Sequence, residues 1–282
     1  APFYLRRTKE AMVYFPERND DGTWEARKIF TKRIPHTVDF AIDGEEFELY
    51  REITRFVKRQ SARAAAEGDN PRARAVGFLM ALYQRRLASS TRSMRRSLEN
   101  RANRLDKGLK QAQALIRTAP PDLPDWEEIE EMEEGEREQL ERMLEAVTLA
   151  GNADMVRQEI AELRELAKEA EGVEQSGAEA KLSKLKGLLE SEGFFDHPDR
   201  LLLLFTEFKD TLQYLVENLE SWGFRVGVIH GGMRPGSRDE PGTRIYTEQQ
   251  FREGEIQVRV ATEAAGEGIN LQCCNILFYY DI

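Results

Sequence analysis

Two short apolar runs near the end of the chain, on either side of a polar segment with glycines, constrain the fold most strongly. Residues 258–261 are rich in β-branched side chains and are typical of a buried strand, and residues 276–280 form a second run of this kind. Gly266 and Gly268 lie in the polar segment between them. Glycines at the carboxyl end of a parallel strand let backbone amides approach a ligand, and ligands bind at that end of an open α/β sheet. We therefore predict a binding site in this segment.

Strand and helix patterns alternate through the last third of the chain. The predicted elements are a helix over 182–189, a strand over 201–205, a helix over 211–222, a strand over 225–229 and a helix over 245–251, followed by the two strands above. Such alternation implies a parallel sheet with right-handed crossovers. With each strand named by one residue, we expect the order Val226, Leu203, Val258, Leu277 across the sheet, so that the strands of Leu203 and Val258 are neighbours.

Three segments of this region resemble motifs of superfamily 2 helicases. ATEAAGEGINLQ at 261–272 is similar to motif V of the second RecA-like domain, in the version carried by Swi/Snf-type and RapA-like bacterial ATPases. LLLLFTEFKDTL at 201–212 resembles motif IV, and VIHGGM at 228–233 resembles motif IVa. Three motifs in this order, at spacings that fit strand–helix units, form a specific signal, whereas a lone Gly-x-Gly would be weak.

The resemblance implies two groups of site residues. The residues that would lie at or shape a nucleotide site, with ATP as the cofactor, are Gly266, Glu267, Gly268 and Asn270. The residues that would line a nucleic-acid track are Thr206, Phe208, Lys209, Gly231, Gly232, Met233, Arg244 and Thr262. Hydroxyls, exposed amides and cations suit contact with a phosphate backbone. A packing role is the stronger interpretation for Phe208, and an exposed charge at a helix start is an equal alternative for Lys209.

Position 270 departs from the commonest pattern of related helicases, which carry Asp there and also at the position of Glu263. The Asn270 amide can still hydrogen-bond a ribose hydroxyl. A tight strand-to-helix turn is the structural alternative for the two glycines.

The other half of a nucleoside-triphosphate site does not occur in this sequence. Such a site needs a glycine-rich loop with lysine, a carboxylate for magnesium and an arginine that faces the γ-phosphate. Gly-x-x-x-x-Gly-Lys-Ser/Thr is absent, and the one Asp-Glu pair, Asp239-Glu240, lies in a loop pattern. Both ends of the sequence look cut from a longer protein. We expect the first RecA-like domain, with most of the ATP and magnesium contacts, and the motif VI arginines to lie in that parent chain.

Charge is strongly separated along the sequence. Residues 51–118 carry 17 Lys/Arg and 5 Asp/Glu, whereas residues 122–179 carry 5 Lys/Arg and 20 Asp/Glu. Separation of this kind suggests one face for a polyanion and another for solvent or a partner.

The basic segment has a helical pattern that restarts at Pro71 after a break at 68–70. Its apolar positions recur at helical spacing: Val76, Leu79, Met80, Tyr83, Leu87, Met94, Leu98 and Leu105. Residues 87–101 resemble a segment between the motor domains of RapA-like enzymes. We predict that Arg92, Arg95 and Arg96 bind nucleic acid, with a solvated helix face packed on the motor core as an equal alternative.

Two further patterns flank this segment. Val38, Phe40 and Ile42 alternate with more polar residues, which predicts a half-buried strand before a helix that Asp43 and Glu46 would cap.

Apolar residues on both sides of 150–152 keep helical spacing: Leu140, Leu144, Val147, Val156, Ile160, Leu163 and Leu166. They predict an acidic antiparallel helical hairpin with a narrow apolar seam. We interpret the hairpin as a passive solvated insertion, with a protein-docking arm as the alternative.

Several classes of protein are excluded by composition. No run approaches eighteen apolar residues, and the start of the sequence lacks the apolar core of a signal peptide, so we expect a cytoplasmic protein with no membrane partner. Cys273 and Cys274 are adjacent and cannot build a disulfide framework or a metal site, and the histidines have no zinc-binding spacing. We expect reduced thiols and no metal ligands.

We therefore expect an α/β protein in which a RecA-like parallel sheet flanked by helices follows a largely helical region. Its predicted parts are an inter-domain strand and basic helical region over 1–118, the acidic helical hairpin over 119–178, and an incomplete second RecA-like domain over 179–282. The chain would belong to an ATP-dependent translocase or helicase that acts on nucleic acid, in first place duplex DNA. Alone it would be inactive. A non-catalytic scaffold, with a degenerate motor domain and a hairpin that bind a protein partner, is the alternative.

Overall fold

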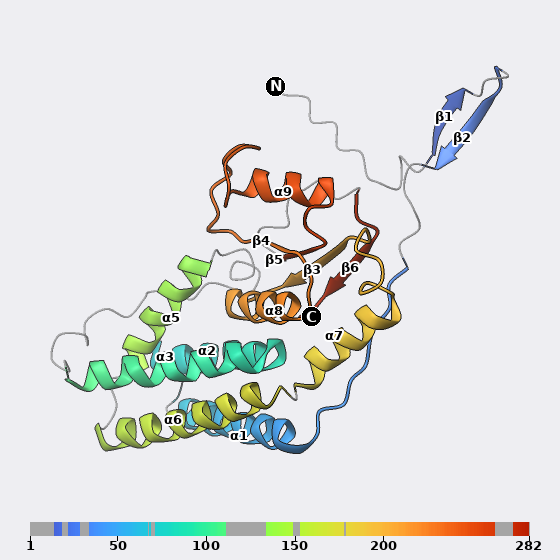
Figure 1. Ribbon diagram of the computed structural model, residues 1–282. Helices are drawn as coiled ribbons and strands as arrows, with labels where there is room; N and C mark the ends of the chain where they lie inside the picture. The colour runs from blue at the N-terminus through green and yellow to red at the C-terminus, as the bar shows by residue number, and fades with distance from the viewer. Residues whose placement is uncertain are drawn as a thin grey trace, which may run out of the picture. The chain divides into compact units, whose positions relative to one another are not determined.

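The computed structural model describes residues 14–18, 22–28, 34–66, 68, 71–110, 134–148, 153–177, 179–262 and 273–281. These residues belong to two compact units, 1–40 and 41–282 (Figure 1). The division of the second unit at residues 118 and 178 that the sequence suggests stays a prediction.

The first unit contains an antiparallel β-hairpin that we did not predict. Strand β1 (Tyr14–Arg18) pairs with β2 (Trp24–Lys28) so that Tyr14 lies opposite Lys28. Gly22 in the connection has a φ of 86°, a left-handed conformation that glycine adopts without steric cost.

The strand predicted over 38–42 is wrong. Residues 34–43 have no regular secondary structure, and the Val38 and Phe40 side chains are 39% and 42% exposed. Alternation alone does not make a strand where no neighbouring strand pairs with it.

Five helices form a layer in the second unit: α1 (Gly44–Ala66), α2 (Pro71–Ser89), α3 (Thr91–Lys110), α5 (Glu134–Thr148) and α6 (Ala153–Ser176). Helix α2 packs against α1, α3 and α5, and α3 lies along α6 (Figure 1). None of the helices in the described part of the chain is long and apolar enough to cross a membrane.

The core of this layer consists of the apolar residues that helical spacing predicted. Leu79, Tyr83, Met94 and Leu98 are fully buried in it. The pattern is interrupted at Ser90, which separates α2 from α3. The Ser90 hydroxyl accepts a hydrogen bond from the Ser93 amide at 3.1 Å, which is an N-cap contact for α3.

The predicted seam between the two acidic helices is wrong, although both helices form. The apolar side of α6, with Ile160 and Leu163, packs against α3 and α1, and α5 packs against α2 and α3. The reason lies in the charges on these helices, because the acidic helices carry glutamates that meet the arginines of the basic ones.

Arginine–glutamate pairs join the basic and acidic segments across the layer. Glu174 of α6 accepts hydrogen bonds from Arg92 Nε at 2.6 Å and from Arg95 Nε at 2.7 Å. Arg101, 1% exposed, binds Glu159 of α6 at 2.6 Å. At these residues the opposite charges of the two segments pair with each other within the layer, whereas the sequence suggested one face for a polyanion and another for solvent or a partner.

The α/β domain follows with α7 (Ala180–Ser191), β3 (Leu202–Thr206), α8 (Lys209–Ser221), β4 (Val226–Ile229), α9 (Arg244–Glu253), β5 (Val258–Thr262) and β6 (Ile276–Tyr279). All of these elements lie where the sequence predicted them. The four strands are parallel, as expected.

The strand order differs from the predicted one. The sheet has the order β4-β5-β3-β6, so β5 and not β3 pairs with β4. Val226 lies opposite Val258, and Leu202 lies opposite the same residue on the other side. The expectation that the strands of Leu203 and Val258 are parallel neighbours is confirmed.

Helices cover the two faces of this sheet. On one face, Leu182 and Leu185 of α7 and Leu215 of α8 share a core with Leu204 and Val260. Helix α9 lies on the other face, against β4 (Figure 1). A four-stranded parallel sheet with helices on both faces is the expected α/β architecture.

The start of α7 is a polar junction between the helical layer and the sheet. The Glu46 carboxylate of α1, which the sequence assigned to a cap of its own helix, accepts a hydrogen bond from the Ala180 amide at 2.8 Å. Next to it Glu179 is 2% exposed, and its Oε2 atom has no hydrogen-bond partner among the residues that the structure describes. Burial raises the pKa of Glu179 to about 7; a hydrogen bond from Tyr214 opposes this, and the nearby Glu46 carboxylate adds to it.

The Glu174 contacts predict a large effect of one charge on stability. Glu174→Gln removes the carboxylate that Arg92 and Arg95 share, so we expect the free energy of unfolding to fall by about 3 kcal/mol in a urea titration. The matched control is Asp154→Asn, which removes a carboxylate that is 78% exposed and paired with Arg157, and should change stability by less than about 0.5 kcal/mol. Equal losses in the two variants would contradict the importance of the buried pairs.

Glu179 predicts a pH dependence of stability. A carboxyl group whose pKa is raised from 4.5 to about 7 binds its proton more tightly in the folded state, so its contribution is fully present below pH 4.5 and is lost as the pH rises through about 7. Glu179→Gln keeps a neutral side chain at every pH. We expect the variant to match the unmutated chain near pH 4.5 and to exceed it by up to about 3 kcal/mol at pH 8, measured by urea unfolding across the pH range. A wild-type advantage at pH 8 would show that the buried carboxylate is stabilising.

Candidate nucleic-acid interface

The carboxyl ends of the four parallel strands meet at one edge of the sheet. Thr206 at the end of β3 lies opposite Thr262 at the end of β5, and Ile229 at the end of β4 lies opposite Ala261. The strands that belong to or lead into the three helicase-like segments therefore end at a common edge. The resemblance predicted site residues in the same place.

Asp281, directly after β6, organises the end of β3. Its Oδ2 atom accepts hydrogen bonds from the Thr206 hydroxyl and, at 2.8 Å, from the Glu207 amide. Its Oδ1 atom pairs with Lys181 Nζ at 3.1 Å. The Thr206 side chain, 1% exposed, is thus directed to Asp281 and is covered.

The same edge is attached to the helical layer. Lys181 also donates hydrogen bonds to the last carbonyls of α2, to Ala88 at 2.8 Å and Ser89 at 3.3 Å. The hydroxyls of Ser89 and Ser90 lie 2.6 Å and 2.7 Å from Thr211 Oγ1 in the first turn of α8. The junction of α2 and α3 is therefore fixed to the start of α8.

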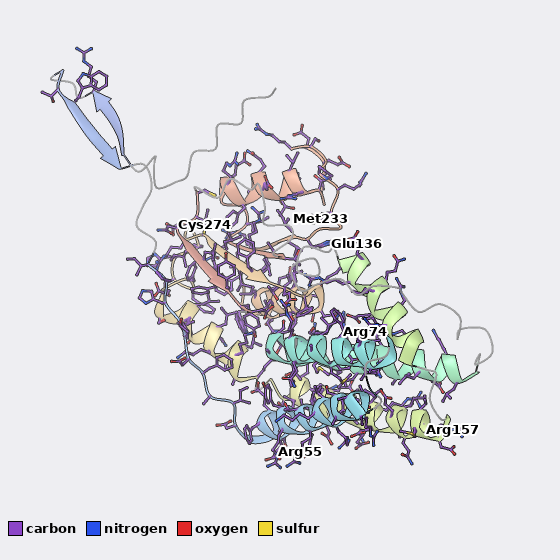
Figure 2. The ribbon with its side chains drawn as sticks, turned by 180° about the vertical axis from the view of Figure 1, so that it is seen from behind. Arg55, Arg74, Glu136, Arg157, Met233 and Cys274 are labelled. Carbon is purple, nitrogen blue, oxygen red and sulfur yellow. The ribbon has the colours of Figure 1, made fainter. Side chains whose placement is uncertain are left out.

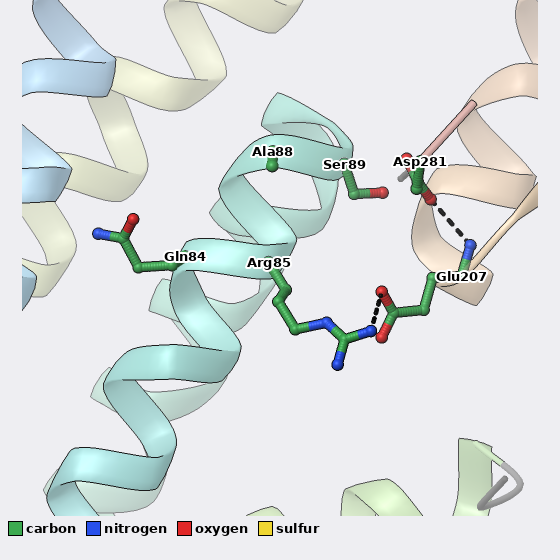
Figure 3. Close-up of a pocket in the computed structure, with 6 residues that line it drawn as sticks. All are labelled: Gln84, Arg85, Ala88, Ser89, Glu207 and Asp281. Carbon is green, nitrogen blue, oxygen red and sulfur yellow. Dashed lines mark hydrogen bonds and ion pairs between the residues drawn. The ribbon is translucent and has the colours of Figure 1, made fainter. Parts of the chain in front are cut away.

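A small cavity lies between α2 and the ends of β3 and β6. It has a volume of about 210 Å³ and is lined by Gln84, Arg85, Ala88, Ser89, Glu207 and Asp281 (Figure 3). Arg85 pairs with Glu207 at 3.1 Å, and Arg137 of α5 lies 3.3 Å from the other carboxylate oxygen. Burial raises the pKa of Glu207 although both arginines oppose this.

Phe208 is fully buried, in agreement with a packing role. The Arg86 guanidinium lies 4.9 Å from the centre of its ring, and the Arg137 guanidinium lies 6.0 Å from it. These are cation–π distances. The ring therefore packs beneath helices α2 and α5.

Lys209, the first residue of α8, is exposed. Burial lowers the pKa of His230, which follows β4, and the positive charge of Lys209 lowers it further. Lys209 and His230 are thus close enough to interact, so the ends of β3 and β4 present a cation and an imidazole at one place. Gly232 beside them is exposed, and Gly231 and Met233 are partly buried.

Arg244 begins α9 and is 30% exposed, with Glu248 one turn away at 3.5 Å. It adds a cation to the loop end that follows β4. Thr262 is 8% exposed.

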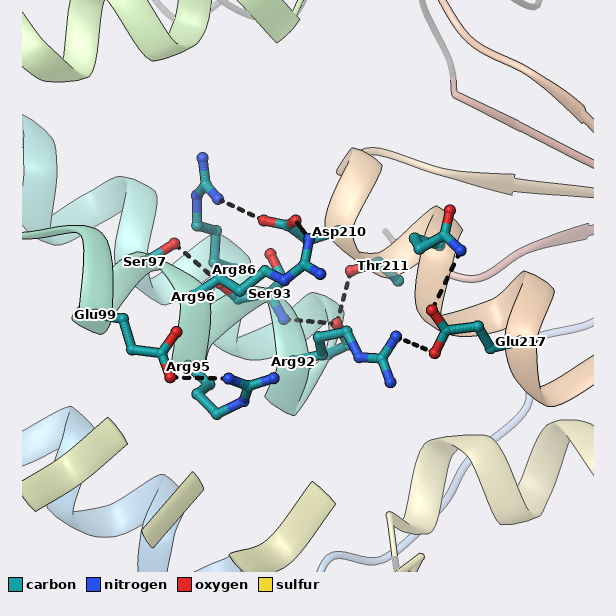
Figure 4. A network of polar contacts seen from close by, with 12 residues as sticks. Arg86, Arg92, Ser93, Arg95, Arg96, Ser97, Glu99, Asp210, Thr211 and Glu217 are labelled. Atoms are coloured by element: carbon teal, nitrogen blue, oxygen red, sulfur yellow. Dashed lines mark hydrogen bonds and ion pairs between the residues drawn. The ribbon is translucent and has the colours of Figure 1, made fainter. Parts of the chain in front are cut away.

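Arg92, Arg95 and Arg96 form a polar network, and Figure 4 shows Glu99 of α3 and Asp210 and Glu217 of α8 as their acidic partners. Glu174 of α6 is a further partner of Arg92 and Arg95. Arg92 also pairs with Glu217, and Arg96 pairs with Asp210 at 2.5 Å. The side chains of Arg92 and Arg95 are 15% and 18% exposed, whereas Arg96 is 44% exposed. Contact of the three with nucleic acid stays a prediction, and Arg96 is the most accessible of them.

The predicted nucleotide residues Gly266, Glu267, Gly268 and Asn270 lie outside the described residues, between Thr262 and Cys273. Cys273 and Cys274 are free thiols. Burial raises the pKa of Cys274, whose thiol donates hydrogen bonds to backbone carbonyls.

Sequence reasoning missed the side chains that hold this edge together, Lys181, Glu207, Thr211 and Asp281. Glu207 and Thr211 lie inside the motif IV segment, and Asp281 ends the last strand run, so their positions carried a signal. Their partners could not be identified from sequence, because each contact spans at least 74 positions or joins two different layers.

Comparison with known proteins assigns the α/β domain. Residues 180–282 match the helicase conserved C-terminal domain family. The uncharacterized ATP-dependent helicase YqhH of Bacillus subtilis is 40% identical over 84 residues, which is 30% of this chain and 14% of that protein. The ATP-dependent RNA helicase DbpA of the same organism is 30% identical over 104 residues, 37% of this chain and 19% of that protein. The chain spans less than a fifth of the length of these two relatives.

Two solved structures align with most of the chain. The Pyrococcus furiosus Hef helicase domain has a TM-score of 0.44 and 14% identity, with 86% of this chain and 47% of that one covered. The C-terminal part of the Fun30 ATPase domain has a TM-score of 0.41 and 16% identity, with 88% of this chain and 74% of that one covered.

Proposed function

We propose that this chain is the second domain of an ATP-driven nucleic-acid motor and completes the ATP site together with the first RecA-like domain. Residues 180–282 supply the C-terminal domain of a superfamily 2 helicase-related ATPase. In this proposal the carboxyl edge of the sheet grips the phosphate backbone. Helices α2 and α3 move with the sheet as one body, because they are joined to α8 by buried hydroxyls and ion pairs. The parent protein would translocate along duplex DNA.

One observation carries the proposal: the strands that belong to or lead into the three helicase-like segments end at the same sheet edge. Thr206, Thr262 and the turn after Ile229 are adjacent there, and Lys209 supplies an exposed cation at a helix N-terminus. Backbone amides at a helix start together with a lysine are suited to a phosphate group. Base-reading side chains are not needed by a motor that moves along any sequence.

The nucleotide half of the proposal rests on the segment that follows Thr262. Gly266 and Gly268 would allow a close approach of the backbone, and the Asn270 amide would hydrogen-bond a ribose hydroxyl. ATP-dependent relatives support ATP as the cofactor. In the parent chain, magnesium and most phosphate contacts would come from the first RecA-like domain, the partner of this one.

Duplex DNA as the substrate and the Swi/Snf and RapA-like branch belong to the proposal as well. The version of motif V at 261–272 supports this branch. Several relatives are named as RNA helicases, so RNA is the competing substrate.

One prediction of this proposal concerns a phosphate contact at Lys209. Lys209→Glu should weaken binding of a fluorescein-labelled DNA duplex about 3- to 10-fold at low salt, because it replaces a phosphate-binding cation by a repelling charge. Fluorescence anisotropy at several salt concentrations measures this, and the slope of log affinity against log salt should fall by about 1. An RNA duplex in parallel shows which nucleic acid is preferred.

Lys184→Glu is the matched control, since Lys184 is exposed on α7 and lies in none of the three helicase-like segments. The two variants have the same net charge. Equal weakening in both would show that only the overall charge matters and would contradict a track at this edge.

The second prediction concerns ATP. This chain alone should show no ATP hydrolysis above background, because phosphoryl transfer depends on positioned charge and an arginine finger alone contributes about a thousandfold or more. The parent protein should hydrolyse ATP, with stimulation by duplex DNA. Gly268→Asp in the parent should abolish this activity, since a side chain would block the backbone approach and add repulsion.

Steady-state assays of the chain, the parent and the parent variant decide between the outcomes. Turnover by the isolated chain would place the catalytic centre elsewhere. Full activity of the Gly268→Asp parent would make the glycine segment a turn without contact to nucleotide.

A further inference from the structure

Two of the predicted track residues are covered in this structure. Thr206 and Phe208 are 1% and 0% exposed. Asp281 covers Thr206 from within the α/β domain, whereas Phe208 lies under the guanidinium groups of Arg86 and Arg137. Arg137 belongs to α5, which is part of the acidic segment. The corner between β3 and α8 is therefore closed by an element that does not belong to the sheet.

Helix α5 is held at this corner by ion pairs, in addition to the apolar packing of Leu140 and Leu144 in the helical layer. Arg137, 6% exposed, reaches Glu207 at 3.3 Å. One turn further, Glu141 pairs with Arg86 and lies 3.7 Å from Arg104. Arg86 in turn lies 3.7 Å from Asp210 of α8. The contacts thus run from α5 through Arg86 to the β3–α8 corner.

An acidic side chain of α5 lies next to Arg137. Glu136 is exposed there (Figure 2). A nucleic-acid backbone that approached Phe208 would meet this carboxylate beside the arginine that covers the ring. Phosphate oxygens and the Glu207 carboxylate are also competing partners for the same arginines, because both accept charge-assisted hydrogen bonds from guanidinium groups.

From these contacts we infer that α5 is an acidic cover of the nucleic-acid track, which competes with the phosphate backbone for the β3–α8 corner. Arg137 is the latch: it binds Glu207 and covers Phe208 when α5 is docked. Binding of nucleic acid and docking of α5 exclude each other at this corner. This inference rests on the proposed function and adds its regulation.

The test compares the whole chain with a variant in which residue 137 no longer binds Glu207. Arg137→Ala should strengthen binding of a fluorescein-labelled DNA duplex at least threefold, measured by anisotropy at low salt. The direction is diagnostic, because loss of a positive charge weakens binding of a polyanion when only net charge acts. The control Arg157→Ala removes an exposed arginine at the far end of the helical layer (Figure 2), and it should leave affinity unchanged or slightly lower.

A covalent lock tests the same competition in the opposite direction, because it holds α5 at the corner. Arg137→Cys and Glu207→Cys are combined with Cys273→Ser and Cys274→Ser, and the two new thiols are joined by a short bismaleimide. The crosslinked protein should bind the duplex at least tenfold more weakly than the same protein alkylated with N-ethylmaleimide, which carries the same substitutions with α5 free to leave.

The outcomes separate this inference from the function on which it rests. The inference that α5 is a cover is overturned if the Arg137→Ala variant binds no better than the Arg157→Ala variant. It is also overturned if the crosslinked protein binds as well as the alkylated protein. Absence of binding to DNA and RNA duplexes by every form, including the unmutated chain, would overturn the proposed function and the cover with it. Binding that responds to Lys209→Glu but not to the latch would leave the function intact and remove the cover alone.

Discussion

The helical layer depends on pairing of arginines with glutamates that are distant in sequence. A guanidinium group as buried as that of Arg101 is strongly unfavourable without a partner, and its partner Glu159 lies 58 positions away. Arg92, Arg95 and Glu174 repeat this arrangement at the other end of the α3–α6 contact. The basic helices α2 and α3 therefore need the acidic helices α5 and α6 to fold as a layer, and apolar burial supplies most of the stabilisation once the charges are matched.

Charge pairing also determines how the layer meets the sheet. Asp210 at the start of α8 lies close to both Arg86 and Arg96, and the Ser89, Ser90 and Thr211 hydroxyls fill the space beside them. A carboxylate in the first turn of a helix is favourable at the positive end of the helix dipole. The junction thus places complementary charges at α8 while Lys209, its neighbour, remains exposed. The acidic and basic residues that build the layer thus leave the Lys209 cation exposed at the sheet edge.

Sequence patterns predicted the helices and strands of the α/β domain well. They predicted poorly which strands pair and which helices pack against each other. Strand 202–206 is apolar up to Thr206, and 258–262 carries a valine on either side of Arg259, so local information sufficed for both. The order of strands depends on which edge a crossover takes, and the pattern around Val226 is the same whether it pairs with β3 or β5. In the helical part, the leucine spacing of 140–166 was correct, but periodicity does not identify the partner of an apolar face. The charge asymmetry contained that information: two segments of opposite sign in one chain can be each other's partners.

Asp281 shows why the candidate interface could not be derived from its own residues. The Thr206 hydroxyl and the Glu207 amide, both at the end of β3, depend on a carboxylate that follows β6, and this carboxylate depends on Lys181 at the start of α7. Lys181 in turn binds the last carbonyls of α2, which a cation stabilises at the negative end of that helix dipole. A contact made at motif IV is therefore connected by direct hydrogen bonds to the end of the sheet and to the helical layer. Because these donors and acceptors are paired with one another, a change at one member alters the geometry of the others at both the sheet edge and the helical layer.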